Sequence, residues 1–449
     1  MSNRGIAPAK QLELPFARRG EATIGPPGEE APVRDGGLME RVVERSNLPA
    51  ALRRVQQNGG SPGIDCMTVE ALPDYLRRKW PKIREQLLSG TYRPHPVRRV
   101  KIPKPGGGVR KLGIPTVLDR FIQQALLQLL QRDWDGTFSG QSYGFRPGRS
   151  AHQAVAQAQR YLGAGYSWVV DLDLEQFFDR VSHDVLMGKL ANRIVDGRVL
   201  RLIRRYLEAG VMANGVVLER HEGTPQGGPL SPLLANVLLD EVDKELERRG
   251  HRFVRYADDC NVYVQSRRAG ERVMRGLISL YAELHLRVNA AKSAVARVWE
   301  RTFLGYSFWV APGRTTKRRV SPKALKTMKE RVREITSRSG GRSIAQVVAE
   351  LRSYLVGWRA YFRLADTPGV FADVDQWLHR RLRMLILKQW KRGPTAYRAL
   401  RARGLSLRSA RAAAAHVSCW WGMATHGALN TAFPVRYFEA LGVPRLGPS

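Results

Sequence analysis

The chain has 449 residues, of which 43% are hydrophobic, so it can bury sizeable cores and is expected to form roughly two to four domains. Its 74 Lys and Arg residues outnumber 40 Asp and Glu residues, and the formal net charge of +34 is far larger than solubility requires. This excess indicates a polyanionic partner, although charge alone leaves open a ribosome-like or chromatin-like binding protein without any chemistry.

Cysteine usage and the absence of targeting segments indicate a cytoplasmic protein. The three cysteines, Cys66, Cys260 and Cys419, include no close pair, which argues against a disulfide framework or a Cys-rich zinc site. The N-terminus has no basic-then-apolar signal pattern, and no run of about 18 apolar residues could span a membrane. We therefore expect an ordinary soluble protein with no membrane partner.

The first part of the chain predicts a leader, a helical segment and a hairpin. Residues 1–37 mix Pro, Gly and scattered charge without periodicity, so they are expected to form a flexible leader. Apolar residues then follow a helical spacing over 38–90, interrupted by turn-forming residues at 58–63. Short apolar runs at 97–103 and 109–114 flank three glycines and predict a β-hairpin.

Helices and strands alternate irregularly in the middle of the chain, which is typical of an α+β domain. We expect helices at 121–132, 151–162, 184–194 and 200–209, a strand at 167–174 and a hairpin at 254–265. After Phe308 the pattern becomes helical, with helices expected at 322–337, 344–362, 370–390 and 394–403. The domain boundary should fall near residues 311–313.

Two stretches of the middle third place carboxylates where a sheet core would not. Asp171 and Asp173 lie at the end of the expected strand, and Asp258 and Asp259 are adjacent at the hairpin tip. Neighbouring carboxylates repel one another, so a divalent cation would stabilise them, although an isolated Asp-Asp pair is more often a solvated turn. Carboxylates without His or Cys nearby suit Mg²⁺ or Mn²⁺ rather than Zn²⁺, and two such ions about 4 Å apart support in-line phosphoryl transfer.

Six motifs in a fixed order resemble those of reverse transcriptases encoded by bacterial group II introns, specifically the compact class C type. In chain order they occupy residues 58–65, 98–105, 110–115, 142–150, 223–236 and 256–259. The resemblance implies an α+β right-hand polymerase, with fingers and palm built on an antiparallel sheet and a helical thumb. It divides the chain into a leader (1–37), fingers and palm (38–310), a thumb or maturase (X) domain (311–392) and a basic DNA-binding region (393–449).

The same resemblance implies three catalytic carboxylates, which are Asp173, Asp258 and Asp259. They would bind two Mg²⁺ ions, for which Mn²⁺ can substitute, with the Leu174 carbonyl as a further ligand. Asp173 is preferred because the family has an aromatic residue five positions after the catalytic acid, which here is Phe178, and Asp171 is the alternative.

The implied nucleotide-binding residues come from four separate segments. Lys104 and Arg110 flank the glycine-rich hairpin tip and would hold the triphosphate, although a solvated basic loop is the alternative. Phe178 would be the steric gate that excludes the 2′-hydroxyl, with an ordinary core Phe as the alternative. Gln226 would lie against the nascent base pair, and Lys292 would act as a catalytic cation near the pyrophosphate.

Template and primer contacts are implied in two segments. The first combines aromatic rings with guanidinium groups suited to stacking and phosphate contact, in Tyr143, Phe145, Arg146 and Arg149. The second resembles the primer grip, where we expect contacts from Gly305 and Tyr306.

The last third resembles the thumb and is strongly basic, since residues 311–449 hold 27 basic and 7 acidic side chains. Trp358 and Phe362 share one face of a helix, for which core packing is favoured over RNA contact. A basic surface is expected from Arg380, Arg381, Arg383, Lys388, Lys391, Arg392, Arg398, Arg401, Arg403, Arg408 and Arg411. The family's Cys- and His-rich endonuclease module is not found, so target-strand cleavage is not expected. Trp421 and Gly422 also depart from the family pattern.

The resemblance predicts an RNA-directed DNA polymerase in the bacterial cytoplasm that binds a group II intron RNA to assist its splicing and mobility. Its partners would be that RNA or another RNA template, a DNA target or primer, and deoxynucleoside triphosphates, and a homodimer is one assembly that the sequence permits. Two alternatives are a domesticated relative in repair or phage defence and a splicing-only RNA chaperone. The intact carboxylates disfavour the chaperone.

Overall fold

The computed structural model describes residues 37–103, 109–213, 216–218, 222–223, 227–313, 315–337, 341–416 and 418–447. Two compact units are present, one formed by the residues up to 154 together with 168–295, and the other by 155–167 together with 296–449. The expected leader, except residue 37, lies outside the described residues. Lys104 and Gln226 lie outside them as well.

A helical layer forms the N-terminal part of the first unit. Its helices are α1 (Leu38–Val42), α2 (Leu48–Asn58), α3 (Leu72–Leu88) and α4 (Val117–Asp135). The helix α4 is buried along most of its length because apolar residues cover more than one of its faces, and α2 packs against it. Thr116 begins α4, its hydroxyl accepting a hydrogen bond of 3.1 Å from the backbone N–H of Asp119.

A four-stranded sheet with the order β2-β1-β4-β5 lies next in this unit. Strands β1 (Val97–Pro103) and β2 (Val109–Ile114) form an antiparallel pair, which confirms the predicted hairpin. The short strands β4 (Val211–Ala213) and β5 (Val216–Leu218) were not predicted, because three residues are too few to show an alternating pattern.

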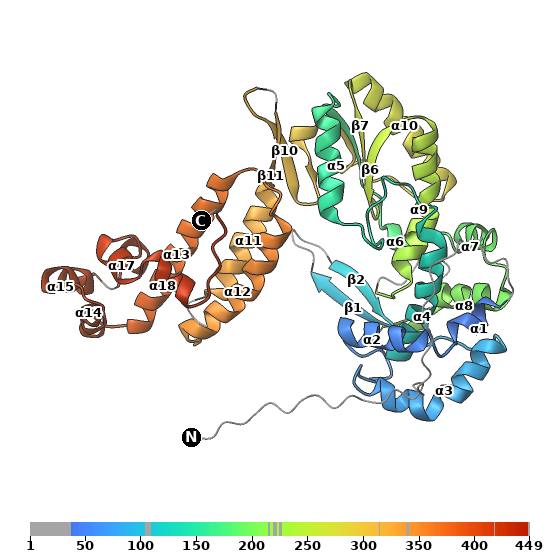
Figure 1. The fold of residues 1–449 in the computed structure, drawn as a ribbon, viewed down its shortest axis with the longest axis horizontal. Helices are drawn as coiled ribbons and strands as arrows, with labels where there is room; N and C mark the ends of the chain where they lie inside the picture. The colour runs from blue at the N-terminus through green and yellow to red at the C-terminus, as the bar shows by residue number, and fades with distance from the viewer. Residues whose placement is uncertain are drawn as a thin grey trace, which may run out of the picture. The chain divides into compact units, whose positions relative to one another are not determined.

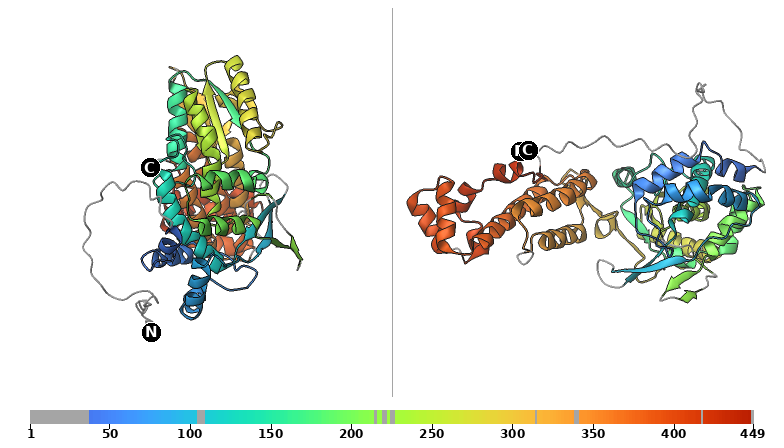
Figure 2. Two further views of the ribbon diagram at one scale, coloured as in Figure 1. Left: turned by 90° about the vertical axis from the view of Figure 1, so that its right-hand side faces the viewer. Right: turned by 90° about the horizontal axis from the view of Figure 1, so that it is seen from below.

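A second sheet, with the order β6-β7-β3-β8, carries the acidic segments. Its strands are β3 (Trp168–Leu172), β6 (Arg252–Tyr256), β7 (Asp259–Val264) and β8 (Ala294–Arg297). The hairpin of β6 and β7 confirms the sequence prediction, and β7 also pairs antiparallel with β3. The helices α9 (Ser231–Arg248) and α10 (Arg267–Glu283) lie beside this sheet (Figures 1 and 2), and α10 packs on β3 and β7.

Four further helices are present, of which three follow the predicted pattern with small differences at their ends, whereas the short one at 177–180 was not predicted. They are α5 (Ala151–Gly163), α6 (Phe177–Arg180), α7 (His183–Ala191) and α8 (Gly197–Glu208). The short α6 directly follows the end of β3, so it lies next to the acidic segment.

After residue 296 the second unit forms a strand meander and then continues as helices. Its sheet has the order β11-β10-β9, from β9 (Thr302–Phe303), β10 (Tyr306–Val310) and β11 (Thr316–Val320), preceded by the 3₁₀ turn η1 (Val298–Glu300). The prediction that the pattern is helical after Phe308 is wrong for β11. This strand carries Lys317, Arg318 and Arg319 in succession, so its sequence shows no apolar alternation. It is a strand because its backbone pairs with β10. Residues 311–313 follow β10 in the connection to β11, and the two units separate at 295 and 296.

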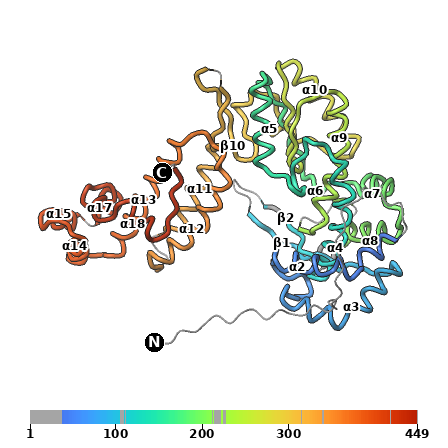
Figure 3. The backbone as a smooth tube through the Cα atoms, in the orientation of Figure 1, coloured from blue at the N-terminus to red at the C-terminus, as the bar shows by residue number. Residues whose placement is uncertain are grey.

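The helices of the second unit match the predictions closely up to residue 402, whereas the shorter helices after it were not predicted. The long ones are α11 (Pro322–Ile335), α12 (Ile344–Tyr361) and α13 (Pro368–Trp390), and the shorter ones are α14 (Gly393–Ala402), α15 (Leu407–Ala415), α16 (Trp420–Met423), α17 (Gly427–Ala432) and α18 (Val435–Ala440). The backbone path in Figure 3 shows α14, α15 and α17 gathered beyond the end of α13. No helix in the described ranges is long and apolar enough to cross a membrane.

Candidate active site

Strand pairing brings the two acidic segments together. In the antiparallel register of β3 and β7, Leu172 lies opposite Cys260, so the next residue along β3, Asp173, lies opposite Asp259. Residues opposite one another in such a pair have Cβ atoms within about 5.5 Å. Asp258 is in the turn between β6 and β7, directly after Ala257. Strand pairing therefore brings the backbone positions of the three predicted carboxylates to one end of this sheet.

The backbone of Asp173 is held on both sides. Its N–H donates to the Ser293 hydroxyl at 3.0 Å, and its carbonyl accepts from the N–H of Asn289 at 2.8 Å. The following residues continue this pairing, because Leu174 forms a bridge with Val288 and is 6% exposed. Backbone contacts thus hold the segment of Asp173 and Leu174 against residues 288–293, which include Lys292.

Lys292 forms an ion pair with Asp173. Its Nζ atom lies 2.9 Å from Oδ2 of Asp173, and the two side chains are 66% and 41% exposed. An ammonium group at this place neutralises part of the charge of the carboxylates and is within reach of an anion bound beside them.

A cleft of about 1790 Å³ opens beside the carboxylates, entirely within the first unit. Of the predicted catalytic and nucleotide residues, it is lined by Asp173, Leu174, Phe178, Asp258 and Lys292. Asp171 does not line the cleft. It lies two residues before Asp173, inside β3, where it pairs with the buried Asn261. This placement favours Asp173 over Asp171 as the carboxylate that faces a substrate.

The chemistry of the candidate ligand atoms suits magnesium, but their positions in this structure do not yet form a metal site. The candidate ligands are carboxylate and carbonyl oxygens, which Mg²⁺ prefers. Among the residues that the structure describes, no group of three or more His, Cys, Asp or Glu side chains is gathered closely enough to hold a metal. In this structure the Asp173 carboxylate is paired with Lys292 instead.

The predicted steric gate, Phe178, lies on α6 at the edge of the cleft. It is half-buried, and its ring meets that of the buried Phe177 edge-on, with centroids 5.1 Å apart. Gln176, just before α6, has φ of 49°, a left-handed conformation that turns the chain sharply after the acidic segment. Because Phe178 both lines the cleft and contacts the core, its position is compatible with the predicted role.

Two predicted nucleotide ligands lie outside the described residues, Lys104 and Gln226. The backbone of Arg110 belongs to β2, where it pairs with Ile102. Three other residues of this region line the cleft, Arg99, Arg120 and Gly227. Sequence reasoning missed Arg99, although it lies inside the 98–105 motif.

Arg120 is a further residue that was missed, and it organises the 58–65 motif. Its guanidinium donates to the carbonyls of Gly59 at 3.1 Å and Ser61 at 2.8 Å, and burial lowers its pKa. Gly60 has φ of 102°, and a Cβ there would lie 2.8 Å from Nη1 of Arg120. The close approach of Arg120 and the positive φ therefore explain Gly60, whereas Gly59 is explained by its own φ of 58° alone, since a Cβ there would meet nothing within 4 Å.

The four predicted template residues separate into exposed and buried pairs. Phe145 is 50% exposed and lines the cleft, and Arg149 is also exposed, with its guanidinium 5.5 Å from the centre of the Tyr143 ring. Tyr143 itself is 6% exposed. Arg146 is 8% exposed and donates to the carbonyls of Ser139, Ser142 and Asp135. Arg146 also lines the cleft, but its guanidinium is taken up by these backbone carbonyls, so a structural role is favoured over the phosphate contact expected from sequence.

The predicted primer-grip residues lie in the second unit. The Tyr306 ring is fully buried between Tyr361 and Phe362, and its hydroxyl donates to the Tyr361 carbonyl. Burial raises the pKa of Tyr306 to about 12. Gly305 has φ of 79°, and a Cβ there would lie 3.2 Å from the Phe362 ring. The side chain of Tyr306 is thus a core group, which leaves backbone contact as the way this segment could meet a primer.

The thumb-like helices of the second unit combine a core with a cation-rich surface. Trp358 and Phe362 are 8% and 6% exposed, with ring centroids 4.8 Å apart, which confirms core packing. The prediction that Arg383 belongs to the basic surface is wrong. It is 8% exposed and donates to the Phe433 carbonyl at 3.0 Å, because its position on α13 faces α17 and α18.

Partly exposed cations of this unit lie over tryptophan rings. Lys388 and Arg380 each lie 3.9 Å from a ring centre, over Trp420 and Trp421 respectively. Cations in contact with aromatic rings are suited to a nucleic acid, which offers phosphates and stacking bases together.

Comparisons with known proteins agree with the geometry of both units. Residues 102–308 match the family model described as reverse transcriptase (RNA-dependent DNA polymerase), and residues 325–404 match the group II intron, maturase-specific domain. The chain is therefore a reverse transcriptase domain followed by a maturase-specific domain. It belongs to the group II intron type of reverse transcriptase and maturase.

Two curated relatives illustrate this membership. The chain is 38% identical over 218 residues to protein YkfC of Escherichia coli, which is 47% of this chain and 57% of YkfC. It is 42% identical over 171 residues to the group II intron-encoded protein LtrA of Lactococcus lactis, which is 38% of this chain and 28% of LtrA. The matched segments thus span only 57% and 28% of these two relatives.

A solved structure of a partial Cas6-RT-Cas1–Cas2 complex is 25% identical, with a TM-score of 0.36, over 55% of this chain and 42% of that chain. This structural likeness is too low to support an argument.

Proposed function

We propose that this protein is an RNA-directed DNA polymerase that acts through Asp173, Asp258 and Asp259. The observation that supports the proposal is the register of β3 and β7, in which Leu172 pairs with Cys260, so that Asp173 follows β3 at the end of the sheet where Asp258 and Asp259 also lie. A cleft bordered by Asp173 and Asp258 is large enough for a nucleotide and part of a duplex. The reverse transcriptase family match over 102–308 supports the same reaction.

Two Mg²⁺ ions, held by these carboxylates with the Leu174 carbonyl as a further ligand, would activate the primer hydroxyl and stabilise the leaving pyrophosphate. Phe178 would lie beneath the incoming sugar and exclude a 2′-hydroxyl by contact. Lys292, released from Asp173, would donate a hydrogen bond to the pyrophosphate as negative charge develops on it.

Residues of the first unit would select and orient the substrates. We assign the triphosphate to Lys104 and Arg110 of the hairpin, and the nascent base pair to the segment of Gln226. Arg99 and Arg120, which line the cleft, add positive charge for the nucleic acid. Phe145 and Arg149 are the exposed members of the template segment and would stack on a base and contact a phosphate.

We assign RNA binding and assistance of group II intron splicing to the second unit. The maturase-specific match over 325–404 and the cations over Trp420 and Trp421 support this assignment. A DNA primer or target and deoxynucleoside triphosphates complete the partners. The splicing-only chaperone is disfavoured because the carboxylates are intact and adjacent in the sheet, and the relatives named above include an intron-encoded protein.

Primer extension on an RNA template with Mg²⁺ tests the proposal. Asp258→Ala is expected to lower the rate by at least about a thousandfold, since it removes a ligand of both ions. Asp184→Ala is the matched control, because Asp184 is an exposed carboxylate on α7 whose side chain is 86% exposed. Equal rates for wild type, Asp258→Ala and Asp184→Ala would refute the assignment.

A further inference from the structure

A fully buried arginine stands two residues before the turn that carries Asp258. Arg255 is 0% exposed, and its guanidinium grips the equally buried Asp243 of α9 through Nε at 2.7 Å and Nη2 at 2.5 Å. Burial lowers the pKa of Arg255, but the Asp243 carboxylate, together with Cys260 and Tyr281, raises it, and the net shift is upward, so the group stays charged. A buried pair of this kind is a poor source of stability compared with apolar packing, so stability alone does not explain its presence.

The other terminal nitrogen of the Arg255 guanidinium, Nη1, bonds to the turn between β6 and β7 that carries Ala257 and Asp258. This nitrogen donates to the Ala257 carbonyl at 2.9 Å and to Oδ1 of Asn236 at 2.9 Å. Ala257 has φ of 58°, a left-handed conformation that a residue with a Cβ adopts only when its surroundings enforce it. The guanidinium therefore bonds to the very peptide group that joins Ala257 to Asp258.

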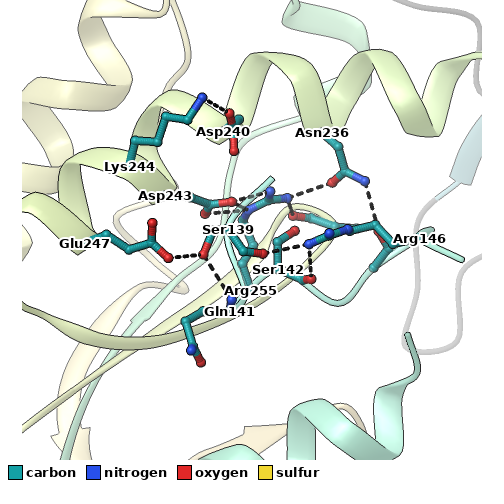
Figure 4. Close-up of polar contacts among 12 residues, drawn as sticks. Ser139, Gln141, Ser142, Arg146, Asn236, Asp240, Asp243, Lys244, Glu247 and Arg255 are labelled. Atoms are coloured by element: carbon teal, nitrogen blue, oxygen red, sulfur yellow. Dashed lines mark hydrogen bonds and ion pairs between the residues drawn. The ribbon is translucent and has the colours of Figure 1, made fainter. Parts of the chain in front are cut away.

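The 142–150 motif closes the same network from the other side, as Figure 4 shows. Asn236 uses its Nδ2 to donate to the Gly144 carbonyl at 2.9 Å. The backbone of Arg255 pairs with this loop as well, donating to the Gln141 carbonyl and accepting from the N–H of Tyr143, both at 2.9 Å. The side chain of Asn236, in the 223–236 motif, is thus bonded to the 142–150 motif directly and to the 256–259 motif through Arg255.

We propose that Asn236, together with the ion pair of Arg255 and Asp243, positions the turn at Ala257 and thereby sets the geometry of the metal site at Asp258. These are positioning residues, since none of them contacts the reacting atoms. The inference rests on the proposed function, because it concerns how Asp258 is presented to the ions. Residues that orient metal ligands in this way typically change metal affinity or activity by about 10-fold to 100-fold when they are replaced.

Asn236→Ala is the informative variant, because it removes the bonds to Arg255 and Gly144 and leaves the ion pair intact. Its matched control is Asn47→Ala. Asn47 also donates through Nδ2 to backbone carbonyls, those of Val42 and Ala125, and also accepts from a side chain, Gln128 at 2.7 Å. It belongs to the helical layer and does not line the cleft.

Two measurements are made on the full chain of wild type, Asn236→Ala, Asn47→Ala and Asp258→Ala. Mn²⁺ binding is followed without turnover by the electron paramagnetic resonance signal of free Mn²⁺, and single-nucleotide incorporation gives kcat and the KM for the deoxynucleotide. Asn236→Ala is expected to weaken Mn²⁺ binding and to lower kcat by about 10-fold to 100-fold, with the KM within about threefold. Asn47→Ala should lower the thermal midpoint and leave both quantities near wild type.

Equal Mn²⁺ affinity and kcat in Asn236→Ala and Asn47→Ala would overturn the inference, provided that Asp258→Ala loses both. If Asp258→Ala instead matches wild type, the proposed function fails first and the inference with it. Should Asn236→Ala not fold, Asn236→Asp replaces it, since a carboxylate still accepts from Arg255 but cannot donate to Gly144. A smaller loss of affinity and kcat in that variant supports the inference, and wild-type values overturn it.

Discussion

The backbone of the 142–150 motif passes very close to the turn at Ala257 and Asp258. One methyl group added at this contact should therefore disturb polymerisation. A Cβ on Gly144 would lie 2.3 Å from the backbone N of Ala257 and 3.0 Å from the carbonyl carbon of Tyr256. Real Cβ atoms essentially never approach within 3.0 Å, and ordinary contact begins at 3.4 Å. In Gly144→Ala the two backbones must therefore separate by about 1 Å, since neither contact is with a side chain that could move aside.

The expected cost of Gly144→Ala has two parts. Overpacking of this kind destabilises the fold by about 1 to 3 kcal/mol. A displacement of about 1 Å at the turn with Asp258 should lower kcat roughly a hundredfold, because reacting groups lose their alignment over such distances.

Single-nucleotide incorporation and thermal unfolding of Gly144→Ala and Gly140→Ala measure the two parts separately. Gly140 is the control in the same loop, because a Cβ there meets nothing within 4 Å and its φ is not in the left-handed region. Gly140→Ala should keep wild-type kcat. A Gly144→Ala variant with wild-type kcat would show that the close approach does not set the position of the turn, and the reasoning would fail.

Three further predictions address the sugar, the pH and the salt concentration. Phe178→Ala should admit ribonucleotides, raising their incorporation relative to deoxyribonucleotides at least about tenfold in primer extension, and unchanged discrimination would refute the steric gate. Burial lowers the pKa of His379 to about 4 in the folded state, so its contribution to stability is present above the unfolded pKa of about 6.5 and is lost as the pH falls toward 4. Unfolding free energy should drop by about 2 kcal/mol more in wild type than in His379→Leu between about pH 7 and pH 5, and parallel curves would contradict this. Lys388→Ala should flatten the plot of log affinity for RNA against log salt by about 0.7 to 0.9, and an unchanged slope would show that Lys388 contacts no phosphate.

Much of the secondary structure could be read from the sequence, because short-range periodicity decides it. The hairpin of β6 and β7 and the long helices α11 to α13 appear where apolar spacing predicts them. Trp358 and Phe362 are core residues, as their helical spacing indicated. The chemistry of the site was also accessible, since adjacent carboxylates at a strand end are costly without a cation.

Tertiary structure alone decided which charged side chains face a substrate. Arg146 and Arg383 look like surface cations in the sequence, yet both are buried and bonded to backbone carbonyls. The same holds for Arg255, whose role depends on Asp243 and Asn236 of a separate helix. A sequence shows that a charge is present, but its solvation and its partners depend on segments far apart in the chain, and those become neighbours only when the sheet forms.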